Sequence, residues 1–132
     1  MAKPTIVSDA AIPCAEEAFG TLGDVRLVPH RELTREVLAD ADMLMVRSVT
    51  PVRAGLLADT PVRFVGTCTA GHDHVDARWL REAGIAWAHA PGCNAQSVAD
   101  YVVAALLELE AAGHLAVRGA RFGIVGFGHV GR

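Results

Sequence analysis

Between Thr5 and Ala88 the chain alternates short apolar runs with segments of helical spacing. The apolar runs predict β-strands at residues 5–8, 25–28, 43–46, 62–65 and 85–88. The intervening segments predict helices at residues 13–22, 32–39, 53–57 and 76–83. Because short links join these elements, the alternation predicts an α/β fold with a parallel, doubly wound sheet. We expect the flavodoxin-like strand order 2-1-3-4-5.

The pattern changes at Asn94. Residues 94–112 predict one long helix with an apolar stripe formed by Val98, Val102, Ala105, Leu106 and Leu109. Phe122 then opens an apolar run that leads directly into a glycine-rich motif. We therefore expect a flavodoxin-like substrate domain over residues 1–93, an interdomain crossover helix over 94–113, and over 114–132 the truncated start of a Rossmann NAD-binding domain with its first strand.

The glycine-rich motif is Gly126-x-Gly128-x-x-Gly131. In a strand–turn–helix context, glycines at this spacing form the turn that holds the pyrophosphate of a dinucleotide. The preceding apolar run supplies the required strand, although a glycine-rich turn without a cofactor stays open as an alternative. The acidic residue that separates NAD from NADP would follow about 20 residues later. The sequence therefore predicts a nicotinamide dinucleotide without choosing between the two.

Polar residues follow the predicted strands, and ligands of parallel α/β sheets bind at the carboxyl ends of strands. Arg47 offers a fixed positive charge, and Ser48 and Thr69 offer hydroxyl donors. Gly71 permits close approach of backbone N–H groups. Together these residues predict a site for an oxygen-rich anion.

Simpler roles exist for each of these residues. Ser48 or Thr50 could cap the short helix at Arg53, Thr69 could bond its own loop, and Arg47 could be an ordinary surface arginine. The His72-Asp73-His74 segment has the spacing of metal ligands, but it needs further ligands from elsewhere, so no metal site is expected. No side chain pairs as nucleophile and base, so covalent catalysis by this chain is not expected.

Composition narrows the classes of function. Hydrophobic residues make up 52% of the chain, charged residues 20%, and the net charge is −3, which favours a folded domain without a nucleic-acid surface. The N-terminus resembles neither a signal peptide nor an anchor, and no apolar stretch is long enough to span a membrane. We therefore expect a cytoplasmic protein. Cys14, Cys68 and Cys93 are expected to be reduced thiols.

Four segments carry a family resemblance: residues 46–50, 64–76, 90–95 and 123–131. In order and spacing they resemble the D-2-hydroxyacid dehydrogenases, and most of all the members that oxidise 4-phospho-D-erythronate to the 2-oxo acid in pyridoxal phosphate biosynthesis. The resemblance implies NAD as cofactor, a small phosphorylated hydroxy acid as substrate, and a cytoplasmic homodimer. It further implies that the catalytic Arg, Glu and His lie beyond Arg132, so that the isolated chain is inactive.

Matched motif positions imply roles for individual residues. Ser48 and Thr69 correspond to substrate-binding residues, and Gly126, Gly128 and Gly131, with the amides of His129 and Val130, correspond to the pyrophosphate turn. The alternatives are another D-2-hydroxyacid dehydrogenase, of the phosphoglycerate or glyoxylate type, and a non-catalytic binding fragment. A signalling receiver domain is disfavoured, because it needs an acid after the third strand and a lysine after the fifth.

Overall fold

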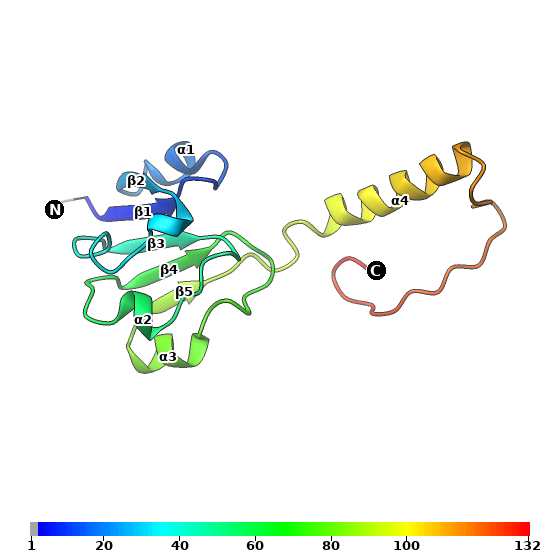
Figure 1. Ribbon diagram of the computed structural model, residues 1–132. Coiled ribbons are helices and arrows are strands. Elements are labelled where there is room, and N and C mark those ends of the chain that lie inside the picture. The colour runs from blue at the N-terminus through cyan, green and yellow to red at the C-terminus, as the bar shows by residue number, and fades with distance from the viewer. Residues whose placement is uncertain (1–2) are drawn as a thin grey trace. The chain divides into compact units, whose positions relative to one another are not determined.

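The computed structural model describes residues 3–132 and contains one five-stranded sheet (Figure 1). All neighbouring strands are parallel and follow the order β2-β1-β3-β4-β5, which confirms the predicted α/β class and strand order. The strands are β1 (Thr5–Asp9), β2 (Asp24–Val28), β3 (Met43–Val46), β4 (Phe64–Thr67) and β5 (Ala86–Ala88). The fourth strand thus lies two residues later than the apolar run suggested.

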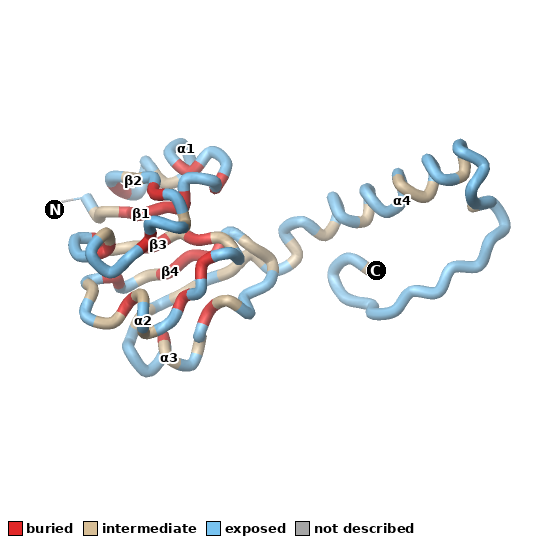
Figure 2. The backbone as a smooth tube through the Cα atoms, viewed as in Figure 1, coloured by how far each residue is buried: buried red, intermediate tan, exposed pale blue. Residues whose placement is uncertain are grey.

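The core forms on one face of this sheet. Val7 pairs with Leu44, and Leu44 pairs with Val65, so these side chains line up across three strands and are fully buried. Leu38, Val52, Leu57, Val62 and Leu80 close over the same core from the connecting segments. Figure 2 shows the buried positions concentrated in and around the sheet. Ile6 and Ser8, on the other face of β1, are buried as well, so this strand is covered on both faces, which explains its continuous apolar run.

The helices are α1 (Ala15–Phe19), α2 (Ala54–Leu57), α3 (Ala77–Glu82) and α4 (Ala95–Ala111). Asp76 caps α3, because its Oδ1 accepts a hydrogen bond from the backbone N–H of Trp79 at 3.0 Å. α1 begins at Ala15, later than expected, and Cys14 at its N-cap adopts a left-handed conformation with φ 53°.

The helix predicted over residues 32–39 is wrong. A 3₁₀ turn, η1 (His30–Glu32), is followed by non-helical turns. The Nη2 of Arg26 on β2 donates to the carbonyl of Val37, which in a helix ending at residue 39 would lie in the last turn without a partner inside the helix. Leu33 and Leu38 are both buried by this irregular path. The apolar residues of this segment are thus buried by separate turns and not by a continuous helix.

The chain divides into two compact units, one ending at Pro91 and one covering Gly92–Arg132. No residue of the second unit is buried, and the predicted apolar stripe of α4 is exposed at Val98, Val102 and Leu109. The strand expected at residues 122–125 does not form, because a strand needs a neighbouring strand to pair its backbone groups and the described residues of this unit supply none.

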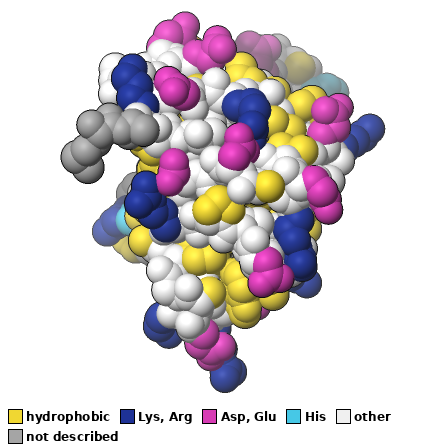
Figure 3. All heavy atoms as spheres, turned by 90° about the vertical axis from the view of Figure 1, so that its left-hand side faces the viewer, with side chains coloured by type: hydrophobic (Ala, Val, Ile, Leu, Met, Phe, Trp, Pro, Cys, Tyr) yellow, Lys and Arg dark blue, Asp and Glu magenta, His cyan; other side chains and the backbone are white. Residues whose placement is uncertain are grey.

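Charges of both signs are interspersed on the face drawn in Figure 3. Neither sign builds a continuous patch among the coloured residues of that view. Within residues 3–132, no helix combines the length and the apolar character needed to cross a membrane.

Core packing yields a direct test. Leu44 is fully buried at the centre of the sheet, so Leu44→Ala should lower the free energy of unfolding by about 2–5 kcal/mol in urea denaturation. Leu22, which is 59% exposed, provides the matched control, and Leu22→Ala should change it by less than about 0.5 kcal/mol. Equal effects of the two substitutions would contradict the assigned core.

Candidate anion-binding site

Arg47 directly follows β3 at the carboxyl edge of the sheet. Its Nε donates to Oδ2 of Asp9, the last residue of β1, at 2.8 Å. The Asp9 side chain is 1% exposed and that of Arg47 is 32% exposed. Arg47 is therefore held by a buried carboxylate and is not an ordinary surface arginine.

Ser48 and Thr50 follow Arg47 in a turn closed by the bond from Thr50 N–H to the Arg47 carbonyl at 3.2 Å. Neither residue caps α2, whose N-cap is Arg53 and has no side-chain capping bond. Ser48 is exposed, and its hydroxyl has no bonding partner within residues 3–132. Its hydroxyl is therefore not committed to another described residue, and its role in binding stays a prediction.

The next strand brings the second loop beside the first. Val46 and Thr67 are register partners, and Cys68 N–H donates to the Val46 carbonyl at 2.9 Å. The loop that carries Thr69 and Gly71 thus leaves the sheet next to the loop that carries Arg47. These four residues, Arg47, Ser48, Thr69 and Gly71, are called the anion rim below.

Thr69 belongs to a chain of hydrogen bonds. Its Oγ1 donates to the Gly71 carbonyl at 2.8 Å, and it lies 2.7 Å from Thr67 Oγ1. Thr67 Oγ1 in turn lies 2.8 Å from His74 Nε2. The simpler role considered for Thr69, a bond to its own loop, is present in this structure.

The number of protons available fixes which group donates in each of these hydrogen bonds. A hydroxyl has one proton, and Thr69 gives its proton to Gly71. Thr67 must then donate to Thr69, and His74 must donate from Nε2 to Thr67. Thr69 therefore offers a ligand an acceptor lone pair in this arrangement, whereas the sequence suggested a donor. Thr67, which is buried, and His74, which is half-buried, thus support Thr69 from the base of the loop.

Aromatic rings at the end of β5 and just after it support the loop that carries Thr69. His89 donates from Nδ1 to the Ala70 carbonyl at 3.0 Å, and Ala90 N–H donates to the Thr69 carbonyl at 3.1 Å. The His72 ring lies 5.1 Å from the Trp87 ring and 4.7 Å from the His89 ring, measured between centroids. The only hint in the sequence is that positions 87 and 89 share one side of a strand.

On the opposite side of the loop, an isolated parallel bridge joins Val52 to Val75. Val52 N–H donates to the His74 carbonyl at 2.8 Å, and Asp76 N–H donates to the Val52 carbonyl at 2.9 Å. The loop is thus fixed at both of its ends. Across the described part of the chain, no group of three His, Cys, Asp or Glu side chains is arranged to hold a metal ion.

The glycine motif lies in the second unit. Gly126 has φ +94°, and a Cβ added at Gly131 would lie 2.5 Å from the Gly126 carbonyl oxygen. Both positions therefore require glycine, and a Cβ at Gly128 would meet no atom within 4 Å. The turn at Gly126 and the close backbone approach at Gly131 fit the first and third glycines of a dinucleotide-binding motif. His129 and Val130 form a turn here and not the first turn of a helix.

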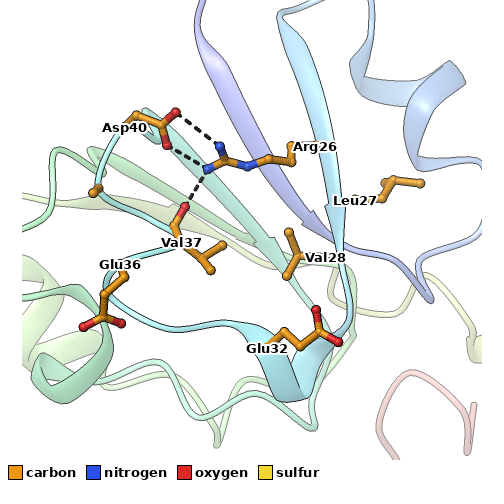
Figure 4. Close-up of a pocket in the computed structure, with 8 residues that line it drawn as sticks. Arg26, Leu27, Val28, Glu32, Glu36, Val37 and Asp40 are labelled. Carbon is orange, nitrogen blue, oxygen red and sulfur yellow. Dashed lines mark hydrogen bonds and ion pairs between the residues drawn. The ribbon is translucent and has the colours of Figure 1, made fainter.

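A separate hollow of about 510 Å³ lies beside β2 (Figure 4). Its polar lining contains Arg26, Glu32, Glu36 and Asp40. Asp40 binds both terminal nitrogens of Arg26, at 2.7 and 3.2 Å, and this hydrogen bonding lowers the pKa of the Asp40 carboxyl. With its one arginine neutralised and two further carboxylates, this hollow does not suit an anion.

Residues 5–124 match the family model described as D-isomer specific 2-hydroxyacid dehydrogenase, catalytic domain. This match, on the parallel α/β fold, shows that the chain belongs to the D-isomer specific 2-hydroxyacid dehydrogenase family. The fold is shared with a 3-phosphoglycerate dehydrogenase of Entamoeba histolytica, at a TM-score of 0.73 and 22% identity over 98% of this chain and 48% of that one.

The curated relatives are more specific. An erythronate-4-phosphate dehydrogenase of Cellvibrio japonicus is 53% identical over 96% of this chain and 32% of its own length. One of Salinibacter ruber is 55% identical over 99% of this chain and 33% of its own length. The chain therefore spans about a third of the length of the curated relatives it matches.

The half-buried position of His74 predicts a pH effect. Desolvation lowers the pKa of His74 below 6.5, although Asp73 opposes this shift. The unfolded chain then binds more protons than the folded chain just below pH 6.5, so the free energy of unfolding should fall as the pH decreases through that range. His74→Gln keeps a hydrogen-bond donor but does not titrate. It should therefore reduce this fall in the free energy of unfolding between pH 7.5 and 5.5, which lie about one unit either side of the ordinary pKa of His. An unchanged slope in urea titrations would contradict the assignment.

Proposed function

We propose that this chain is the substrate-side lobe of an NAD-dependent 4-phosphoerythronate dehydrogenase, which oxidises 4-phospho-D-erythronate to the 2-oxo acid. The observation that carries the proposal is the open guanidinium of Arg47 beside the free hydroxyl of Ser48 at the sheet edge, in a chain 53% identical to an enzyme of that name. The same family resemblance supports a cytoplasmic homodimer that takes part in pyridoxal phosphate biosynthesis.

In this proposal the lobe positions the substrate. Arg47 donates from its terminal nitrogens to an anionic end of the substrate, and Ser48 donates its hydroxyl to the same end. Thr69, whose proton is committed to Gly71, accepts a hydrogen bond from a substrate hydroxyl. The pairing of an anion with a neighbouring hydroxyl suits a sugar acid. Holding the substrate in one orientation lowers the entropic part of the barrier.

The glycine turn serves the cofactor. Gly126 would form the tight turn and Gly128 would allow the backbone to approach the pyrophosphate of NAD, and the amides of His129 and Val130 would donate to it. When bound, NAD supplies the acceptor for the hydride that leaves the substrate. The chain's own contribution is to orient the two ligands.

The activity is tested on the full-length protein that contains these residues. With NAD, its kcat/KM for 4-phospho-D-erythronate should exceed those for D-3-phosphoglycerate and D-glycerate by at least about 10²-fold, because a site that bonds the extra groups rejects analogues lacking them. NADH formation measured by absorbance provides the readout. Equal or better turnover of phosphoglycerate would assign the chain to another branch of the family.

The anion rim is tested in the same enzyme. Ser48→Ala and Thr69→Ala should each raise KM for the substrate by about tenfold, the usual effect of removing one hydrogen bond to a charged or buried partner. Thr34→Ala removes an exposed hydroxyl from the segment between β2 and β3 and should leave KM unchanged. If both rim variants keep the wild-type KM and kcat, the rim does not bind substrate.

A further inference from the structure

Asp9 is a buried charged residue at the end of β1 and is not one of the four residues of the anion rim. Its side chain is 1% exposed, in a position where an isolated carboxylate would be strongly unfavourable. Both of its oxygens are used: Oδ1 accepts from Ala11 N–H at 3.0 Å, and Oδ2 accepts from Arg47 Nε at 2.8 Å. Asp9 therefore has no oxygen left over for a ligand of its own.

The way Asp9 holds Arg47 leaves part of the guanidinium open. Only Nε is bonded, and within residues 3–132 the terminal nitrogens Nη1 and Nη2 have no partner. Those two nitrogens form the fork that binds carboxylates and phosphates in a bidentate manner. The inner side of Arg47 is thus fixed while its outer side stays available.

A second arginine–aspartate pair shows the opposite arrangement. Asp40 takes both terminal nitrogens of Arg26, and Nη2 of Arg26 also bonds the Val37 carbonyl (Figure 4). Both terminal nitrogens of Arg26 are thereby occupied by the protein, whereas its buried Nε has no partner within residues 3–132. At Arg47 the arrangement is reversed, because Nε is bonded and the terminal nitrogens are left free.

We propose that Asp9 is the positioning residue for Arg47: from inside the sheet it aims the open guanidinium fork at the anionic end of the substrate. This inference rests on the proposed function, because it needs the anion rim to be a substrate site. Asp9 itself does not touch the substrate. Its effect reaches the substrate only through the orientation of Arg47.

The test is a double-mutant cycle in the full-length enzyme. Asp9→Asn keeps the acceptor for Ala11 but removes the charged acceptor for Arg47, so KM should rise about tenfold with kcat nearly unchanged. Arg47→Ala should raise KM at least as much. Because Asp9 acts through Arg47, adding Asp9→Asn to Arg47→Ala should raise KM no further.

Stability provides an independent readout of the same pair. Arg47→Ala leaves the Asp9 carboxylate buried without its cation, so the variant should melt at a lower temperature. The double variant removes that buried charge and should recover part of the loss. Asp9→Glu, which keeps the charge, should restore KM partly relative to Asp9→Asn, and Asp40→Asn, which removes the exposed ion pair with Arg26, should leave KM at the wild-type value.

The outcomes separate the two proposals. If the wild-type enzyme oxidises a different 2-hydroxy acid and the cycle holds for the KM of that substrate, the proposed substrate is wrong and the role of Asp9 stands. If Asp9→Asn lowers KM or leaves it unchanged, or if it raises KM further in the Arg47→Ala background, Asp9 does not act by positioning Arg47.

Discussion

The parallel register of β1, β3 and β4 is the constraint on which the candidate site depends. Parallel strands end at the same edge of a sheet, so Asp9 at the end of β1 and Arg47 after β3 become neighbours although 38 positions separate them. The same register sets Thr67 beside Val46 and brings the second loop to the first. A strand order that removed β3 from between β1 and β4 would separate these residues.

The pair between Asp9 and Arg47 also links stability to the site. Burying a carboxylate costs several kcal/mol unless it is paired and hydrogen-bonded, and here Arg47 and the Ala11 amide meet that requirement. The arginine is consequently held in place before any ligand arrives, which reduces the side-chain entropy lost on binding. The loop of Thr69 is fixed as well, by β5 on one side and by the Val52–Val75 bridge on the other.

Most of the sheet could be predicted from the sequence because buried strands such as Met43–Val46 read as continuous apolar runs with turn residues between them. Residues 32–39 have the apolar spacing of a helix, but the turns that bury Leu33 and Leu38 form only in the folded chain. Arg47 and Thr69 are recognisable as candidates because each follows a predicted strand, whereas the bonds they form with Asp9 and Thr67 depend on the fold. The Gly71 carbonyl can only accept, so it makes Thr69 the donor, and this in turn fixes Thr67 and His74 as donors.

The second unit differs from the first because none of its apolar residues is buried. α4 exposes apolar residues around its circumference, including Tyr101, Val103 and Leu107 in addition to the predicted stripe. A helix that is apolar on all sides is stable in water only when several surfaces cover it. Here the segment after α4 offers partial cover, since Ile124 and Val130 line a hollow of about 330 Å³ with Val102 and Val103. The anion rim and the glycine turn thus differ in kind, because the rim is fixed by its own sheet, whereas the residues that follow Gly128 form a turn and no helix within the described chain.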